Sequence, residues 1–386
     1  MIIPILFEPN FAENSIWCDS IRQGIESYAQ EKKYATMIID GQNYREYDYN
    51  RLFENEPRIV LLVSSSPAWG ENALRFFEKE QIAVVLHDCS NSESSAIKAR
   101  VHFDYKGSFK LIFRHLDECG CKQIALYGFF IHSTSDQLKL QYFREESQRR
   151  GITDTEGLCF ENKSNLDSCY EIFRKHIRDF DAVICVNSLA AVSLVDHLKK
   201  DNIRIPDDIQ IISCGDCNLC RHISPSITSV VGLDSTAGCQ AVKAYKYCYS
   251  SGNVPLVMNL LLQGELIQRA STKPKYTSLV NDRKDPFDLP KPTRESLQIN
   301  FYNDSTIRSL SNLEKLLTCC DDIDIRMLKM FLDNMPHDQM SENLFISRGS
   351  IFYRLKRIAS NFSIRTYAEL KTFLIENRFL DFINDI

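Results

Sequence analysis

The sequence predicts an α/β protein with two doubly wound Rossmann-like lobes, followed by an all-α domain. From residue 1 to about 270, short and almost continuously apolar segments alternate with amphipathic ones. Parallel strands alternate in this way with the helices that cover both faces of their sheet. The alternation restarts after residue 104, which indicates a second lobe. Beyond residue 300 only helical spacing of the apolar residues remains, which predicts a separate helical domain.

The first lobe opens with a strand, IIPILF, and an amphipathic helix over residues 15–33. In that helix Ile16, Ile21, Ile25 and Tyr28 share one side, so we expect this side to face the sheet. Apolar runs and helical periodicity predict the elements that follow. The expected strands are 34–40, 58–64, 82–88, 123–129, 181–187 and 209–215, and the expected helices are 70–80, 106–120, 137–151, a segment around 166–179, and 188–202.

A proline-rich stretch separates the two parts of the chain. Four of the twelve prolines lie between residues 274 and 292, among Lys, Asp and Ser residues, and this composition predicts an exposed linker. We place the linker at 273–300 and the helical domain at 301–386. Within that domain the apolar spacing predicts helices over 305–317, 324–335, 337–345, 347–362 and 366–383.

Composition and charge limit the class of protein. The chain has 386 residues, of which 44% are hydrophobic and 25% charged, as in globular proteins with a full core. No apolar run approaches the roughly 18 residues of a membrane span, and the first residues lack the basic segment of a signal peptide. The fourteen cysteines are scattered, so we predict reduced thiols and a cytoplasmic location.

The net charge of −5 is unevenly distributed along the chain. Residues 341–365 contain five basic residues and one acid, about +4, which leaves about −9 for the remainder. A basic end on an acidic protein favours a dedicated nucleic-acid-binding element. In this region HDQMSENLFISRGSIFYRLKRI predicts a short helix, a tight turn and a basic helix, a helix-turn-helix at about 337–360.

The basic helix has the side-chain distribution that such an element needs. Ser347 is placed to cap its N-terminus, and Ile351, Leu355 and Ile358 form an apolar stripe. The polar and basic residues on the other sides are the candidate DNA contacts: Ser347, Arg348, Ser350, Tyr353, Arg354 and Arg357. First-turn side chains would meet base edges, while Arg and Tyr would hold phosphates. The alternative is a solvated amphipathic helix in a small bundle.

The segment ISRGSIFYRLKRI resembles the C-terminal helix-turn-helix of PucR-type and sugar-diacid-type regulators. Their pattern is a hydrophobic residue, His-Arg-Asn-Thr-Val, one variable residue, and Tyr-Arg-Leu-x-Arg-Ile. Ser350 stands where the pattern has Thr, Ser347 where it has His, and Gly349 where it has Asn. The last two departures concern the DNA sequence that would be recognised. The matching positions are Arg348, Ile351, Tyr353, Arg354, Leu355, Arg357 and Ile358. The likeness covers about residues 322–380 and implies double-stranded DNA as a partner.

Residues 1–272 resemble the effector-binding domain of the LacI/GalR repressors, a relative of periplasmic sugar-binding proteins. HLDECGCKQIALYG resembles the family's His-Leu, Gly-His, Ile-Ala run. Residues 181–216 resemble the stretch from a strand ending in Asn-Asp to Gly-Phe-Asp-Asp, while PSITSV and GELIQRAST resemble later family segments. The resemblance implies a type I periplasmic-binding-protein fold. Lobe 1 would be about 1–103 plus 232–260, and lobe 2 about 104–231 plus 261–272.

This resemblance implies that a ligand binds between the lobes, at the carboxyl ends of the strands. The candidate effector-binding residues that it carries over are Asn10, Phe11, Lys139, Asn187 and Asp216. Lys139 stands where the family usually has Arg, and it lacks the bidentate fork. Gly215 stands at the family's first Asp, which commonly binds sugar hydroxyls, and Asp216 could compensate. For each residue the alternative is loop capping or packing between the lobes.

The stretch SCGDCNLCRH places Cys214, Cys217 and Cys220 at three-residue spacing, with His222 nearby. Zinc sites usually pair Cys-x-x-Cys with a second ligand pair some distance away, and a bacterial iron–sulfur run has a fourth cysteine. We therefore predict no metal site here. A redox-sensing thiol at Cys217 or Cys220 is the alternative.

Taken together, these patterns predict a ligand-responsive, DNA-binding transcription regulator with a small-molecule effector, a sugar or a nucleoside. Both resemblances imply a homodimer. No nucleotide-binding or catalytic motif is present in the sequence, so we predict no enzyme activity and no cofactor. The alternative is a solute-binding or signalling module that does not bind DNA.

Overall fold

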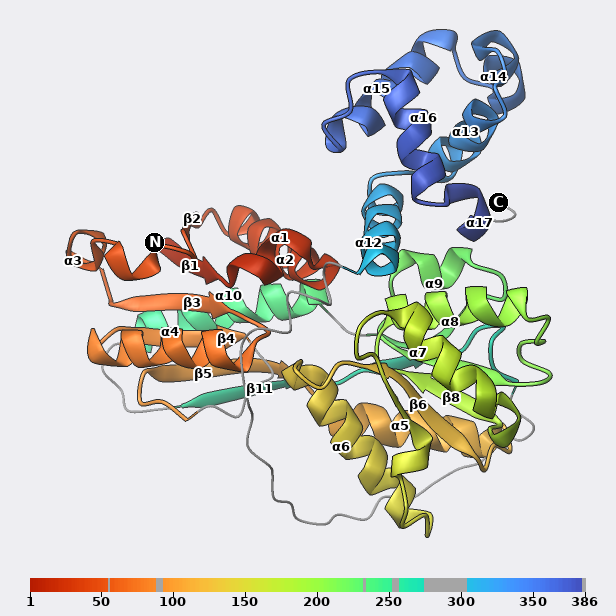
Figure 1. The fold of residues 1–386 in the computed structure, drawn as a ribbon. Helices are drawn as coiled ribbons and strands as arrows, with labels where there is room; N and C mark the ends of the chain where they lie inside the picture. The colour runs from red at the N-terminus through yellow and green to blue at the C-terminus, as the bar shows by residue number, and fades with distance from the viewer. Residues whose placement is uncertain (55, 88–92, 232–233, 252–256, 274–303, 384–386) are drawn as a thin grey trace.

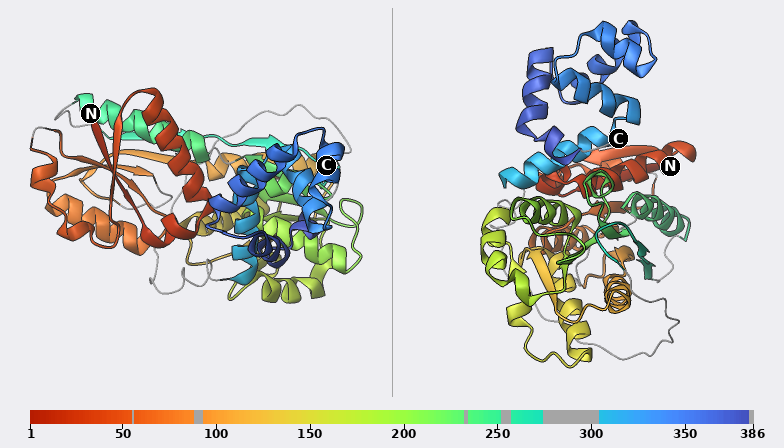
Figure 2. Two further views of the ribbon diagram at one scale, coloured as in Figure 1. Left: turned by 90° about the horizontal axis from the view of Figure 1, so that it is seen from above. Right: turned by 90° about the vertical axis from the view of Figure 1, so that its right-hand side faces the viewer.

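The computed structural model describes residues 1–54, 56–87, 93–231, 234–251, 257–273 and 304–383. Two six-stranded sheets form two lobes, and a group of helices lies to one side of both (Figures 1 and 2). The predicted fold class, two doubly wound α/β lobes followed by a helical domain, is confirmed. The predicted linker, apart from its first residue, lies outside the described residues.

Lobe 1 is a parallel sheet in the strand order β11-β5-β4-β3-β1-β2. Its strands are β1 (Ile2–Phe7), β2 (Ala35–Ile39), β3 (Ile59–Val63), β4 (Ala83–His87), β5 (Ile97–Phe103) and β11 (Met258–Leu262). Its helices are α1 (Pro9–Asn14), α2 (Ile16–Glu31), α3 (Tyr49–Leu52), α4 (Pro67–Lys79) and α10 (Asp234–Ser251), with a 3₁₀ turn at Tyr44–Glu46. Side chains alternate between the two faces, so Leu61 packs with α2 and α10 while Leu62 packs with α4.

Lobe 2 has the order β12-β10-β9-β8-β6-β7, and only β12 runs antiparallel to its neighbour. Its strands are β6 (Ile124–Phe129), β7 (Cys159–Glu161), β8 (Ala182–Cys185), β9 (Gln210–Cys214), β10 (Thr228–Val231) and β12 (Glu265–Ile267). Its helices are α5 (Tyr105–Glu118), α6 (Thr134–Arg149), α7 (Leu166–Phe173), α8 (Ser188–Lys200) and α9 (Asn218–His222), with 3₁₀ turns at Glu156–Leu158 and Arg174–Asp179.

The chain passes between the lobes three times. It crosses after β5, after β10, and between β11 and β12. The last crossing lies at residues 263–264, slightly later than the boundary of 260–261 that we expected. These three strands are thus the mechanical connection between the lobes.

The helical domain contains α12 (Ser305–Thr318), α13 (Asp322–Leu332), α14 (His337–Leu344), α15 (Arg348–Asn361), α16 (Tyr367–Glu376) and α17 (Phe379–Phe382). Helix α12 lies between the other helices and the two lobes (Figure 1). The expectation of one helix over 366–383 is wrong. Arg378 adopts a left-handed conformation with φ of 58°, and the side chain of Asn377 donates to the Phe373 carbonyl at 2.7 Å, which ends α16.

Among the described residues, no helix combines the length and the apolar character that a membrane crossing requires.

Candidate ligand cavity and nucleic-acid interface

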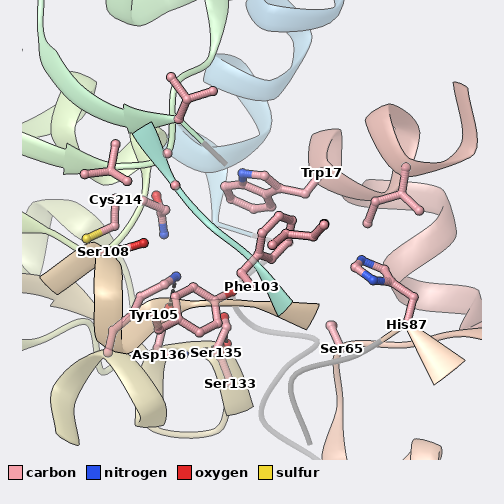
Figure 3. A pocket seen from close by; sticks show the side chains of 18 of the residues that line it. Trp17, Ser65, His87, Phe103, Tyr105, Ser108, Ser133, Ser135, Asp136 and Cys214 are labelled. Atoms are coloured by element: carbon pink, nitrogen blue, oxygen red, sulfur yellow. Dashed lines mark hydrogen bonds and ion pairs between the residues drawn. The ribbon is translucent and has the colours of Figure 1, made fainter. Parts of the chain in front are cut away.

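A cavity lies between the two lobes, at the carboxyl ends of the parallel strands (Figure 3). Segments that follow β1, β3, β6 and β8 line it, together with the last residues of β4, β5 and β9. Open parallel sheets bind small molecules at this edge. From lobe 1 the lining residues are Phe11, Trp17, Ile21, Ser64, Ser65, His87 and Phe103, and from lobe 2 they include Tyr105, Ser108, Phe130, Ser133, Ser135, Asp136, Lys139, Asn187, Cys214 and Gly215.

Aromatic rings form much of the cavity wall. Figure 3 shows Trp17 from the first turn of α2, Phe103 from the end of β5 and Tyr105 from the first turn of α5 around one space. Phe11 and Phe130 add two further rings. Aromatic faces of this kind can cover the apolar face of a ring-shaped ligand, while polar side chains around them set its orientation.

His87, the last residue of β4, provides a polar group in the cavity wall. Its Nδ1 lies 2.8 Å from the Val101 carbonyl oxygen. Only a protonated Nδ1 can donate to a carbonyl, which leaves Nε2 as an acceptor in the neutral ring. Burial lowers the pKa of His87 to about 4, so the ring is uncharged at neutral pH.

Lys139 lies in the cavity wall and is paired there with an acid. Its Nζ is 3.1 Å from Oδ1 of Asp136, and both side chains are buried. The second oxygen of Asp136 accepts a hydrogen bond from the Phe130 backbone N–H at 3.0 Å. The Lys139 ammonium also lies over the Tyr105 ring. The charge of Lys139 is therefore balanced inside the protein.

Of the other candidate effector-binding residues, Phe11 and Asn187 also line the cavity. Asn187 caps α8, because its Oδ1 accepts from the Ala190 N–H at 2.9 Å. Its amide group faces the same lobe interface as Lys139, so capping and cavity lining coincide in one residue. Asn10 lies in α1, and its side chain is outside the described part of the structure.

Asp216 does not line the cavity, whereas its neighbour Gly215 does. The Asp216 carboxylate is buried and forms a bidentate pair with Arg269, at 2.6 and 2.7 Å, and a contact of 3.2 Å with Arg221. Gly215 has φ of 133°, a conformation that favours glycine. The carboxylate is thus occupied in holding the end of β9 against the strand segment that carries Arg269.

Sequence reasoning missed His87, Trp17, Phe103 and Tyr105 as cavity residues. Three of them lie at the end of a strand or within the first two residues after one: His87 ends β4, Phe103 ends β5, and Tyr105 follows β5. The rule that ligands bind at the carboxyl ends of parallel strands could have found these three. Trp17 had no such signal, since it follows a whole extra turn, α1.

Comparisons with known proteins extend this description. A sequence model of the periplasmic binding protein-like domain matches residues 113–272. The HTH-type transcriptional repressor PurR of Haemophilus influenzae (strain PittEE) is 23% identical over 280 residues, 71% of this chain and 80% of that protein. Catabolite control protein A of Staphylococcus aureus (strain Mu50) is 21% identical over 222 residues, 56% of this chain and 66% of that protein.

Solved structures give the same result at the level of the fold. A transcriptional regulator CelR–cellobiose complex has a TM-score of 0.60 and 17% identity, covering 70% of this chain and 84% of that one. The transcription regulator CcpA of Lactococcus lactis has a TM-score of 0.57 and 18% identity, covering 71% of this chain and 100% of that one. The two lobes have the LacI-type regulator fold. The cavity of this LacI-type domain therefore lies in the cleft between its lobes.

Beyond the LacI-type domain, α14 and α15 are joined by a tight turn. Phe345 ends α14 with φ of 55° and is 95% exposed. Ser347 caps α15 as expected, because its Oγ accepts from the Ser350 N–H at 3.1 Å. The predicted apolar stripe of α15 is buried. Two helices with this connection and a buried stripe have the form of a helix-turn-helix.

The six candidate DNA contacts lie in two groups. Ser347, Gly349, Ser350 and Tyr353 border a shallow groove at the start of α15, and Tyr353 is 68% exposed. Arg348 is also exposed and pairs with the equally exposed Asp338 of α14. Arg354 and Arg357 border the groove too, but their guanidinium groups contact carboxylates of α13 and its cap.

The cysteine stretch that follows β9 lies beside the cavity. Cys214 lines the cavity, and burial raises the pKa of its thiol to about 12. The sulfur atoms of Cys217 and Cys220 are 3.9 Å apart and buried, and burial raises the pKa of Cys217. Within the described residues, no group of three His, Cys, Asp or Glu side chains could hold a metal ion. The redox hypothesis for Cys217 and Cys220 stays a prediction.

Proposed function

We propose that the protein is a ligand-responsive transcription regulator, in which a small molecule in the interlobe cavity controls DNA binding by α15. It would act as a homodimer in the cytoplasm, with two copies of α15 facing two half-sites. The relatives that match the LacI-type domain are transcriptional regulators, which supports this proposal. The observation that carries it is the position of α12, which connects the helix-turn-helix to both walls of the cavity.

On the side of lobe 2, α12 contacts the start of α9 through Glu314. The buried carboxylate of Glu314 accepts hydrogen bonds from the backbone N–H groups of Asn218 and Leu219, at 2.9 and 3.0 Å. It also accepts from the side-chain amide of Asn218 at 2.8 Å. Asn218 follows the cavity residue Gly215 by three positions, so this carboxylate is attached to the end of the cavity wall.

On the side of lobe 1, α12 contacts α2 through the very next residue. Lys315 forms an ion pair with Asp19 at 3.2 Å, and Asp19 follows the cavity residue Trp17 by two positions. Adjacent residues of one helix thus contact elements that begin in opposite walls of the cavity. A ligand that favours one interlobe angle would change these two contacts together, and α12 would pass the change to α13–α15.

The charges around the cavity indicate the kind of ligand. Lys139 is balanced by Asp136, and His87 is neutral, so an anionic ligand would meet no unbalanced cation among these residues. Aromatic rings and serine hydroxyls remain as the recognition surface. We therefore propose an uncharged, hydroxyl-bearing ring compound, a sugar or a nucleoside, that contacts Phe11, Lys139 and Asn187.

The test is selection of DNA by the full chain from a random-sequence duplex library, followed by a gel shift with the enriched sequence. We expect enrichment of a sequence with two half-sites. The double variant Arg348→Ala with Tyr353→Ala should weaken binding to that sequence at least tenfold, since each good side-chain contact to a base contributes about 1–3 kcal/mol. If no sequence is enriched and no duplex is shifted at low salt, the protein is a solute-binding module instead.

A second prediction concerns the coupling between the cavity and α15. A thermal-shift screen of neutral sugars and nucleosides would identify a ligand, and its effect on DNA affinity would then be measured. Typical coupling factors are about 5- to 150-fold. Lys315→Met is expected to bring this factor close to one with little loss of stability, because the Lys315–Asp19 pair is partly exposed.

The matched control is Arg308→Met, which removes the same charge from an exposed position of the same helix. This variant should keep the coupling factor of the unmodified protein. Equal coupling factors in Lys315→Met and Arg308→Met would contradict a role for the lobe 1 contact.

A further inference from the structure

Two arginines of α15 are held by acidic side chains of the helical domain itself. Nη1 of Arg354 lies 2.8 Å from Asp321 and 2.8 Å from Asp324. Arg357 contacts the other oxygen of Asp324, whose side chain is completely buried. Asp321 caps α13 and Asp324 is in its first turn, where the two form a reciprocal capping box. The arginines therefore join α15 to the start of α13.

The charges of this cluster cancel. Two guanidinium groups face two carboxylates, so the four residues contribute no net charge toward an approaching phosphate. Hydrogen bonds from the two acids raise the pKa of Arg354, which agrees with a tightly held pair. Displacing an arginine toward DNA would leave the buried carboxylate of Asp324 with a lost partner, which is strongly unfavourable. Affinity for DNA follows the cations that neutralise phosphates, so this cluster would add little to it.

A different set of side chains occupies the outer face of α15. Gly349, Tyr353 and Lys356 follow one another at spacings of four and three, so they lie in one line on the helix. All three are exposed, opposite the buried stripe of Ile351, Leu355 and Ile358. In the described part of the chain, Lys356 has no ion-pair partner.

We propose that Lys356 is a phosphate contact of α15, together with Tyr353 and Arg348, and that Arg354 and Arg357 are positioning residues that fix α15 on α13. This assignment rests on the proposed DNA-binding function. It differs from the expectation that the sequence pattern suggested, in which Arg354 and Arg357 hold phosphates. Arg348 fits the outer set because its only described ion pair, with Asp338, is exposed and readily exchanged.

The experiment is the salt dependence of duplex binding by the full chain. A fluorescent duplex of arbitrary sequence, about 30 base pairs long to span two half-sites, is titrated between about 50 and 200 mM salt. Each lost phosphate contact lowers the slope of log K against log salt by about 0.9. We expect this loss in Lys356→Gln, whose side chain is exposed and packs against no core residue.

The comparison variant is Arg354→Gln combined with Asp321→Asn. It removes one ion pair, keeps the net charge, and retains a side chain that can cap α13. Circular dichroism establishes that it is folded, and its salt slope is expected to equal that of the unmodified chain. Lys371→Gln, on α16, is the control for loss of an exposed positive charge elsewhere in the domain and should also keep the slope.

The outcomes separate this inference from the proposed function. An unchanged slope in Lys356→Gln overturns the inference, and so does a lowered slope in the Arg354→Gln, Asp321→Asn variant. In either case the unmodified protein still binds DNA, and the proposed function stands. If the unmodified chain binds no duplex at any salt concentration, the proposed function fails and the inference fails with it.

Discussion

Gly238→Ala is expected to lower the free energy of unfolding by about 3 kcal/mol, in the upper range for overpacked sites. Helices α2 and α10 are in close contact at this glycine. A Cβ atom on residue 238 would lie 2.1 Å from the carbonyl oxygen of Ile21 and 2.8 Å from the backbone nitrogen of Ile25. Both are backbone atoms of α2 and cannot rotate away, so the helices must separate. The gain of about 1 kcal/mol in helix propensity is too small to offset this.

Urea unfolding monitored by circular dichroism measures the effect. Gly157→Ala is the control, because a Cβ at Gly157 meets no atom within 4 Å and the residue adopts no left-handed conformation. Equal unfolding midpoints for the two variants would contradict the close contact between α2 and α10. Since Trp17 and Ile21 of α2 line the cavity, Gly238→Ala should also weaken ligand binding.

Asp216→Ala is expected to destabilise the protein by about 3 kcal/mol, the usual cost of removing one partner from a buried ion pair. The lost carboxylate forms two hydrogen bonds with Arg269, whose side chain is 12% exposed. Arg269 keeps its bonds to the Ile227 carbonyl and the Ser229 hydroxyl, but its charge is no longer balanced. Thermal unfolding at neutral pH measures the loss.

The same pair predicts a pH dependence. Burial acts to raise the pKa of Asp216, but hydrogen bonds and the charge of Arg269 outweigh it, and the pKa lies below its usual value. A lowered pKa in the folded state means that the pair stabilises the fold above about pH 4 and that this stabilisation is lost as the pH falls through the folded pKa. The stability difference between the unmodified protein and Asp216→Ala should therefore be constant near neutrality and shrink below about pH 4.

Asp216→Asn distinguishes the two roles considered for this residue. A structural carboxylate predicts reduced stability in this variant, with ligand affinity affected only through the loop. A direct ligand contact predicts the reverse, a loss of ligand affinity at full stability. The burial of Asp216 outside the cavity lining leads us to expect the first result.

The architecture of the two lobes follows from local patterns, and these could be predicted from the sequence. The strands at β3, β4 and β8 are nearly continuous apolar runs, and the helices between them have one apolar side. Such patterns depend only on residues that are near each other in the chain. The break at Arg378 was missed because the apolar spacing continues through it, while a left-handed residue is set by backbone geometry.

The cavity was only partly predictable. Phe11, Lys139 and Asn187 came from a family likeness and do line it, whereas Asp216 came from the same likeness and lies outside it. The difference is Arg269, which is 53 residues further along the chain and takes up the Asp216 carboxylate. No spacing rule connects residues so far apart, and only the packing of the strands brings them together.

The basic segment gives the clearest division between the two kinds of information. The sequence alone determined that α15 is amphipathic, capped by Ser347 and rich in positive charge, since these properties depend on neighbouring residues. Residues 301–386 as a whole contain eleven basic and twelve acidic residues. Only the tertiary structure decided which positive charges remain unbalanced. Packing of α13 against α15 places Asp321 and Asp324 on Arg354 and Arg357 and leaves Lys356 facing outward, because ion pairing depends on distance in space and not on distance along the chain.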